Sequence, residues 1–232
     1  MNLLAIDTST ERATVALATK GELLSEEHGA LRQHAQMLLP IIGRLLASSE
    51  LNLSQLDGIV FGRGPGSFTG LRIACSVAKA LAYAHDLPIF PVSSLASIAY
   101  SAYESEGKSM LDAKGSLQKM DVLAMLDARM QQVYWGQFTA AGEAEVIERV
   151  SAAADVLLSG EAPVMVVGVG LESYIPQLPL AIQDRVAKQL TVFPNASTMI
   201  HLVQSGQFKP MNAAESLPVY IRNQVTQGEP RG

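Results

Sequence analysis

The chain has 232 residues, 48% of them hydrophobic, with a formal net charge of −5 and one cysteine. This length is typical of one or two domains, and the apolar content is ample for a core. The negative charge disfavours tight autonomous nucleic-acid binding, because such binding rests mainly on phosphate neutralisation by Lys and Arg. The single Cys75 excludes an internal disulfide framework and favours a reducing cytoplasm. No apolar run reaches the roughly 18 residues that span a bilayer, so no membrane association is expected.

The first half of the sequence predicts strands and helices in alternation. The N-terminus indicates a strand rather than a signal peptide, since it has no basic segment and its apolar run stops at Asp7. Ser93 is an expected helix N-cap, and Pro40 should kink its helix or mark the first turn. The predicted elements are a strand at 3–7, a returning strand at 14–18, a helix at 34–50, a strand at 56–61, a helix at 70–84, a strand at 89–92 and a helix from Ser93 to near Tyr103.

The opening pattern returns in the second half. An apolar strand at 122–127 again ends in an aspartate, a strand at 133–138 returns from it, and 141–143 is again a turn. A strand–Asp–turn–strand unit in each half predicts two like-built α/β lobes. The remaining predicted elements are a helix at 151–158, a strand at 164–168, and a helix at 196–205 with Asn195 as its cap and Gly206 at its end.

The boundary between the lobes is expected in the polar, glycine-containing stretch 104–119. This gives an N-terminal lobe over 1–105, which carries the partner-binding helices described below, and a C-terminal lobe over 118–226. The late helix at 196–205 is expected to pack back on the N-terminal lobe. The tail at 227–232 is polar with Gly and Pro, and this composition predicts disorder.

The most informative segment is FGRGPGSFTGLR at 61–72, which joins a predicted strand to a predicted helix. A glycine-rich turn at a helix N-terminus leaves unpaired backbone N–H groups in a loop with few Cβ atoms, which suits either an anion or a neighbouring stretch of backbone. The loop lacks the Lys-Ser/Thr ending of a P-loop. The next strand, at 89–92, offers no acidic residue for a ribose, so a dinucleotide site is not supported. Arg63 and Arg72 would either present charge to a partner or to a nucleotide at the partner boundary, or simply be solvated at the surface, and the sequence does not choose between the two.

Two predicted helices carry more apolar surface than one sheet can cover. The apolar residues of 37–48 spread over an arc of about 200°, whereas a surface helix needs a stripe little wider than about 100°. The helix at 70–84 is similar, apart from a narrow polar stripe. A wholly internal helix pair and a helical association face both explain this pattern, and we favour the second. The predicted interface residues are His34, Met37, Leu38, Ile41, Ile42, Leu45, Arg72, Ser76, Lys79 and Tyr83.

Three segments, LLAIDTSTERATVAL at 3–17, FGRGPGSFTGLR at 61–72 and PVYIR at 218–222, resemble the TsaB (YeaZ) family. The resemblance implies two ribonuclease H-like lobes of the actin-like ATPase and sugar kinase superfamily. It also implies a non-catalytic scaffold that pairs with a TsaD-type transferase through its N-terminal helices and forms a homodimer when alone. With a TsaE-type ATPase, that complex transfers a threonylcarbamoyl group to adenosine 37 of ANN-decoding tRNAs, and the chain would meet tRNA only through the complex.

In that superfamily the first turn, Asp7-Thr8-Ser9, occupies the position of a phosphate loop. A carboxylate about 4 Å from a phosphate charge is repelled by roughly 4 kcal/mol at an effective dielectric near 20. A helix N-terminus returns at most about 2 kcal/mol. Asp7 would therefore face a nucleotide only through a cation such as Mg²⁺. We favour the alternative, in which Asp7 and Thr8 cap the turn of a hairpin.

The equivalent second turn, Asp127-Ala128-Arg129-Met130, has no glycine where kinases of the superfamily carry two. Its side chains would crowd a phosphate, so a structural Asp127–Arg129 pair is favoured over phosphate binding. No cofactor is expected for the isolated chain, and ATP or ADP with Mg²⁺ at the partner boundary stays open. The candidate nucleotide or anion contacts are Asp7, Thr8, Ser9, Arg63, Gly64, Gly66, Ser67, Thr69, Gly70, Asp127 and Arg129.

Metal and nucleophile chemistry find little support in the sequence. The four histidines have no ligand spacing, and residues 94–98 carry no histidine where TsaD-type enzymes hold their metal with His-x-x-x-His. No Gly-x-Ser-x-Gly elbow is present, and Cys75 lies on an apolar helical arc. We therefore expect a cytoplasmic, non-catalytic scaffold without a metal site. The alternatives are a self-sufficient nucleotide-dependent phosphotransferase using Asp7 and Asp127 around Mg²⁺, and a homodimeric interaction module outside tRNA modification.

Overall fold

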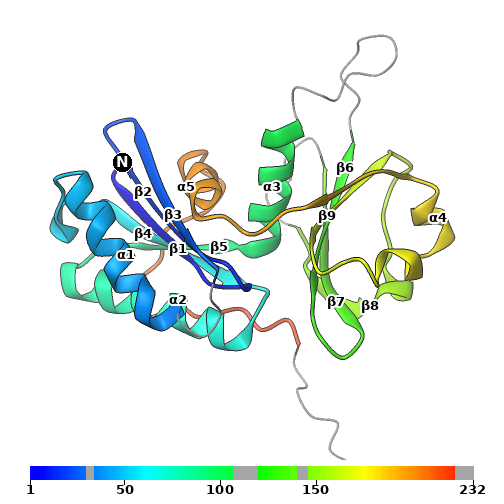
Figure 1. Cartoon of the computed structure of the whole chain (residues 1–232), viewed down its shortest axis with the longest axis horizontal. Helices are drawn as coiled ribbons and strands as arrows, with labels where there is room; N and C mark the ends of the chain where they lie inside the picture. Colours follow the sequence, from blue (N-terminus) through cyan, green and yellow to red (C-terminus); the bar gives the residue numbers. More distant parts are fainter. Residues whose placement is uncertain (30–33, 107–119, 140–145, 223–232) are drawn as a thin grey trace, which may run out of the picture.

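The computed structural model describes residues 1–29, 34–106, 120–139 and 146–222, which form two sheet-containing lobes side by side (Figure 1). The first sheet has five strands in the order β3-β2-β1-β4-β5. Antiparallel β1 and β2 form a hairpin, β4 runs parallel to β1, and β5 runs parallel to β4. The elements of this half are β1 (Leu3–Asp7), β2 (Ala13–Thr19), β3 (Glu22–His28), α1 (His34–Ser48), β4 (Gly58–Gly64), α2 (Phe68–His85), β5 (Ile89–Ser93) and α3 (Ser94–Glu106).

Helices cover both faces of the first sheet, which explains why β1 is apolar up to its last residue. Leu4 and Ile6 belong to a core shared with α1 and α2, whereas Leu3 and Ala5 belong to the core on the opposite face, formed with the late helix α5 (Ala196–Gln204). Every residue of β1 is buried, as expected for a strand covered on both sides.

The second sheet repeats the first. Its order is β10-β9-β6-β7-β8, and β6 pairs antiparallel with β7 and parallel with β9, as β1 pairs with β2 and β4. The predicted duplication of a strand–Asp–turn–strand unit is therefore confirmed. The elements of this half are β6 (Asp121–Asp127), β7 (Gln132–Phe138), β8 (Arg149–Ala152), β9 (Val164–Val169), α4 (Leu180–Gln183), β10 (Val186–Thr191) and α5.

Two helices are exchanged between the halves of the sequence. The helix α3, which precedes the second sheet in sequence, packs Leu95, Ile98 and Ala102 on that sheet. The helix α5, which follows the second sheet, packs Met199 and Ile200 on the first sheet. Figure 1 shows both helices between the two sheets, α5 on the side of the first and α3 on the side of the second.

The predicted helix caps are confirmed, but two elements differ from expectation. The Ser93 hydroxyl accepts the Ala96 N–H at 3.0 Å, and the Asn195 side chain caps α5. The strand β3 is additional: its sequence, ELLSEEH, forms a largely exposed sheet edge with weak apolar alternation. The helix expected at 151–158 is wrong, because β8 extends into this region and only a short 3-10 turn, Ala153–Asp155, follows it.

The C-terminal segment also lies on the first lobe. An isolated bridge joins it to β5, and the Val219 N–H donates to the Arg63 carbonyl at 2.8 Å. The late helix thus packs on the first lobe as predicted. The segment after it also contacts that lobe, so only the earlier part of 118–226 belongs to the second lobe. None of the described helices is long and apolar enough to cross a membrane. Outside the described residues lie most of the predicted boundary stretch, the turn at 141–143 and the tail at 227–232.

Candidate functional site

The glycine loop closes on the turn between β1 and β2. A side chain at Gly62, Gly66 or Gly70 would overlap atoms of this turn. At Gly70 the added Cβ would collide with the carbonyl oxygen of Thr8, which is backbone and has no freedom to move aside. The loop with few Cβ atoms therefore receives the chain's own backbone, which is one of its two predicted uses.

This contact encloses the first turn. Asp7, Thr8 and Ser9 have exposed fractions of 0%, 0% and 2%. The Thr8 hydroxyl donates to the Gly70 carbonyl at 2.6 Å, and the Ser67 N–H donates to the Ser9 carbonyl at 2.7 Å. Protein atoms already surround these three turn residues, so the structure gives no support to the less favoured possibility that they contact a nucleotide. Among the glycine-loop residues that were candidate nucleotide or anion contacts, Gly64 and Gly70 are buried. Gly66, Ser67 and Thr69 are more accessible.

The Asp7 carboxyl is buried, and one of its two oxygens has hydrogen-bond partners. Its Oδ1 accepts from the Ser9 N–H at 3.0 Å and from the Ser9 hydroxyl at 2.8 Å, which confirms the predicted capping of the turn. Its Oδ2 is buried without a hydrogen-bond partner among the described residues. Burial raises the pKa of Asp7 from 3.8 to about 6, against the opposing effect of the Ser9 hydrogen bonds. In the described part of the chain, no group of three His, Cys, Asp or Glu side chains is placed to hold a metal ion.

Arg63 points into the junction between the lobes. Its guanidinium lies 3.2 Å from the carboxylate of Glu148, and the two side chains are 24% and 8% exposed. Ser93 hydrogen-bonds the same carboxylate. Arg63 is thus paired with an internal carboxylate, which neither of the two roles that the sequence left open for it, partner contact and a solvated charge, included. No local pattern links a glutamate of the second half to the glycine loop, so the sequence did not single out Glu148.

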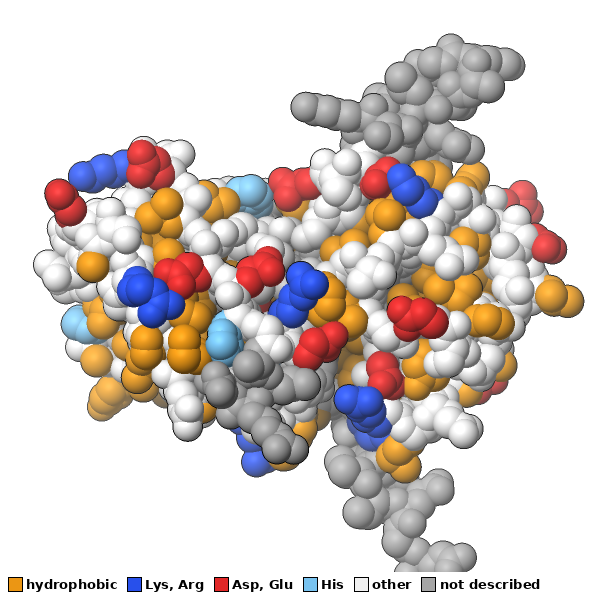
Figure 2. Space-filling view, viewed as in Figure 1, with side chains coloured by type: hydrophobic (Ala, Val, Ile, Leu, Met, Phe, Trp, Pro, Cys, Tyr) orange, Lys and Arg blue, Asp and Glu red, His pale blue; other side chains and the backbone are white. Residues whose placement is uncertain are grey.

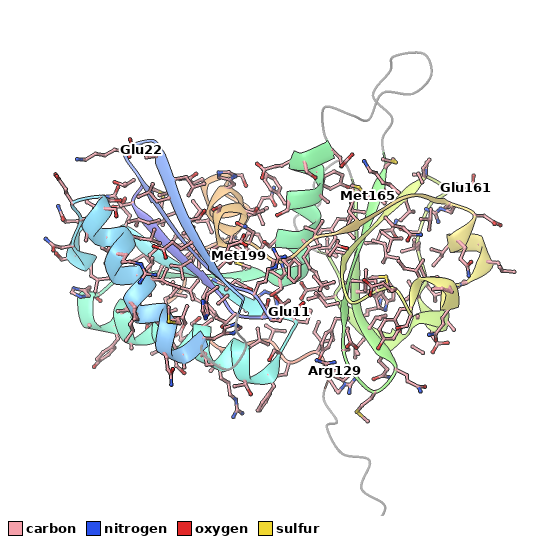
Figure 3. The ribbon with its side chains drawn as sticks, viewed as in Figure 1. Glu11, Glu22, Arg129, Glu161, Met165 and Met199 are labelled. Carbon is pink, nitrogen blue, oxygen red and sulfur yellow. The ribbon has the colours of Figure 1, made fainter. Side chains whose placement is uncertain are left out.

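The turn between β6 and β7 is built on Asp127. Its carboxylate accepts from the Arg129 N–H at 2.7 Å and from the Tyr174 hydroxyl at 2.8 Å, and it pairs with the Arg129 guanidinium at 3.1 Å. The predicted Asp127–Arg129 pair is therefore confirmed. The Arg129 side chain, labelled in Figure 3, remains 87% exposed at the edge of the second lobe.

The same turn is strained, and the C-terminal segment holds it. Arg129, Met130 and Gln131 have φ values of 63°, 53° and 59°, a left-handed conformation that costs a non-glycine residue about 1–2 kcal/mol. Arg222 donates to the Gln132 side chain at 2.6 Å and to the Arg129 carbonyl at 3.4 Å. Arg222, whose role the sequence left open, thus docks the end of the described chain on the second lobe.

The apolar arc of α1 packs inside the first lobe. Of its six predicted interface residues, Met37 is half-buried and five are buried, so the predicted association face is wrong for those five. The arc is wide because α1 has two internal neighbours, the first sheet and α2. Leu39, at 56%, is a large hydrophobic residue of this helix that is exposed. The buried five are His34, Leu38, Ile41, Ile42 and Leu45.

The polar stripe of α2 is divided between solvent and the C-terminal segment. Lys79 donates to the carbonyls of Ala214 and Ser216 at 3.1 and 3.0 Å. The Arg72 Nε donates to the Tyr220 hydroxyl at 3.1 Å. These contacts dock the C-terminal segment on α2 and give Tyr220 its place. Ser76 and Tyr83, the other two residues of the stripe, are exposed.

An open groove of about 420 Å³ lies between the start of α1 and the first half of α2. Figure 2 shows hydrophobic side chains among polar ones on the α1 side of the first lobe. The Arg72 guanidinium stacks 3.8 Å from the centre of the Phe68 ring. Two predicted interface residues, Arg72 and Ser76, are thus brought together at one surface. The groove is lined by Ala35, Phe68, Thr69, Arg72, Ile73, Ser76 and Val77.

Known proteins of similar sequence establish the family. A family model described as tRNA N6-adenosine threonylcarbamoyltransferase (TsaD) matches residues 26–206. A Haemophilus influenzae relative, named tRNA threonylcarbamoyladenosine biosynthesis protein TsaB, is 34% identical over 97% of this chain and 95% of its own. The chain belongs to the TsaB family. The Escherichia coli TsaB is 38% identical over 60% of this chain and 55% of its own.

Solved structures of the TsaB (YeaZ) family share the fold. YeaZ from Pseudomonas aeruginosa superposes with a TM-score of 0.80 at 34% identity, over 94% of this chain and 99% of that one. A second P. aeruginosa structure, described as an uncharacterized protein with similarity to peptidase YEAZ, gives a TM-score of 0.83 at 35% identity, over 95% and 99%. The two sheets of this chain connect their strands in the same way. Together with the similarity to these sequences and structures, this confirms the predicted TsaB resemblance and its two-lobed, actin-like fold.

Proposed function

We propose that this protein is the non-catalytic subunit of a complex that forms threonylcarbamoyladenosine in tRNA, and that it binds a TsaD-type transferase. Its TsaB relatives carry the name of that biosynthesis. The enclosed first turn supports the non-catalytic part of the proposal, because the glycine loop packs directly on the turn that, by the family resemblance, would be the phosphate loop. The same enclosure weighs against a phosphotransferase that uses Asp7.

The docking surface in this proposal is the groove between α1 and α2. Its lining combines apolar side chains with an arginine stacked on a phenylalanine, and aromatic residues and arginine are prominent among the residues that dominate interface energies. A stable interface buries about 800 Å² per side. The partner would therefore extend beyond the groove to exposed Leu39 and Tyr83. A second copy of the chain competes for this surface and forms the homodimer expected for the isolated protein.

The other partners belong to the assembled pair in this proposal. A TsaE-type ATPase and tRNA would meet the complex rather than the free chain, consistent with the net charge of −5. An ATP or ADP with Mg²⁺ at the subunit boundary would lie at the N-terminus of α2. Ser67, Thr69 and Arg72 are exposed there, and a helix N-terminus favours an anion.

Reconstituted threonylcarbamoyl transfer tests the function. The reaction contains tRNA, the transferase, the ATPase and the enzyme that forms the activated threonylcarbamoyl intermediate, with or without this protein. We expect transfer to require the protein and to survive Asp7→Asn and Asp127→Ala. Full activity without the protein would refute the proposal. Activity lost in Asp127→Ala, with the complex still assembled, would show that the turn at Asp127 takes part in the chemistry.

Substitutions in the groove test the docking surface separately. Ser76→Arg places a long charged side chain among apolar groove residues, and we expect it to weaken binding of the transferase on the order of 10-fold or more. Ser173→Arg makes the same change at an exposed serine of the second lobe and should leave binding unchanged. Calorimetric titration measures both affinities. Equal affinities would place the interface elsewhere without touching the proposed function.

A further inference from the structure

The Glu148 side chain crosses from the second lobe into the junction with the first. Glu148 directly precedes β8, and its neighbours Ile147 and Arg149 are exposed. The Glu148 side chain itself is only 8% exposed. Burying a carboxylate is costly unless it is paired and hydrogen-bonded. The groups that surround the Glu148 carboxylate must therefore stabilise its buried charge.

Groups of the first lobe converge on this carboxylate. Arg63, in β4, brings a guanidinium nitrogen within 3.2 Å of Oε2. Ser93, at the end of β5, donates its hydroxyl to Oε1. The same Ser93 oxygen accepts the Ala96 N–H at 3.0 Å. The hydroxyl is therefore polarised by the N-terminus of α3, a helix of 13 residues whose dipole favours negative charge at this end.

These groups have the composition of an oxyanion site. An arginine, a hydroxyl donor and a helix N-terminus are recurring partners of carboxylates and phosphates in proteins. Pairing of the parallel strands β4 and β5 brings them together, since Gly64 lies opposite Ser93. Burial raises the pKa of Glu148, whereas Arg63 and Ser93 lower it. The negative charge of the carboxylate thus depends on both partners.

We propose that Arg63, Ser93 and the first turn of α3 form a binding site for a carboxylate or phosphate oxyanion between the lobes, and that Glu148 is its internal ligand. The site belongs to the first lobe and the ligand to the second, so their contact ties the lobes together. An intramolecular ligand acts at a high effective concentration. The site therefore admits a free anion only after the Glu148 carboxylate is removed.

Glu148→Ala followed by anion rescue tests this proposal. We expect the substitution to raise the unfolding constant on the order of 10-fold or more, because it leaves a largely enclosed Arg63 unpaired. Sodium phosphate or sodium acetate, added at constant ionic strength, should then raise the Tm of the variant with a saturable dependence. The wild type should show no such rise, and Arg63→Ala in the Glu148→Ala background should abolish it. Equal anion effects in wild type and variant, or rescue that persists without Arg63, would overturn the proposal.

Two further variants complete the experiment. Glu26→Ala removes a carboxylate from an exposed pair with Arg44 on the first lobe, where little stabilisation and no saturable rescue are expected. Glu148→Gln keeps the side-chain volume and provides a folded variant if Glu148→Ala does not fold. In the Glu148→Gln variant, the backbone amide hydrogens at 93–96 and 146–150 should exchange with solvent on the order of 10-fold faster than in the wild type. Hydrogen exchange in β1 and β6 should be unchanged. Exchange that is unchanged at both junction segments would contradict the interlobe contact.

Discussion

The substitution Asp7→Asn tests most directly how the buried carboxyl of the enclosed turn affects the stability of the protein. Folding moves the Asp7 carboxyl from a setting in which its pKa is 3.8 to one in which its pKa is about 6. This difference of about 2 units corresponds to roughly 3 kcal/mol. Because the folded-state pKa is raised, the stabilisation by the protonated carboxyl is complete below about pH 4 and is lost as the pH rises through about 6. At neutral pH the wild type therefore carries a penalty of roughly 3 kcal/mol relative to acidic conditions.

Asparagine does not ionise, so the substitution removes this pH dependence. Its amide oxygen can accept the Ser9 hydrogen bonds, while its amide nitrogen takes the place of the unpartnered Oδ2. An unsatisfied buried donor costs about 1–3 kcal/mol. The free energy of unfolding of the variant minus that of the wild type should be lowest near pH 4, where the wild-type carboxyl is protonated. It should then rise by about 3 kcal/mol towards pH 8.

Urea unfolding of both proteins across this pH range provides the measurement. The raised pKa of Glu148 contributes to both proteins and cancels in the difference. A difference that stays constant with pH would refute the assignment of Asp7 as a buried carboxyl of raised pKa. A difference that falls with rising pH would show that the folded protein stabilises the ionised form.

Three further predictions concern packing and the C-terminal segment. Gly70→Ala should destabilise the protein by about 2 kcal/mol or more because its methyl group meets backbone. Gly43→Ala, in open space on α1, should stabilise it by about 0.5–1 kcal/mol in the same urea assay. Ile41→Ala should cost about 2–5 kcal/mol, whereas exposed Leu39→Ala should stay within about 0.5 kcal/mol; similar Tm values would contradict the inward-facing arc of α1. Arg222→Ala should speed hydrogen exchange in the β6–β7 turn on the order of 10-fold, and unchanged exchange would mean that the turn does not need the C-terminal segment.

Local sequence patterns predict the local parts of this fold. The two hairpins follow from apolar runs that end in aspartate, and the caps at Ser93 and Asn195 follow from residue type and position. The glycine loop stands out equally well. Whether it holds an anion or backbone is decided by Thr8 and Ser9, which belong to a turn far away in sequence.

Long-range contacts account for the parts that the sequence did not predict. The wide apolar arc of α1 shows that the helix is covered on two sides, but it does not say whether the second cover is α2 or another protein. Glu148 and Arg222 each act on an element from a distant part of the chain. No sequence pattern around either residue indicates its role. From the sequence alone, both look like ordinary charged residues of the surface.

The exchange of α3 and α5 determines when the chain can finish folding. During synthesis the strands of the first sheet emerge well before α5, whose Met199 and Ile200 close one of its faces. That face stays uncovered on the ribosome until the second sheet has also been made. In the finished protein each sheet takes part of its cover from outside its own half of the sequence. Separating the halves would therefore leave two incomplete cores, and the lobes should unfold together in one transition.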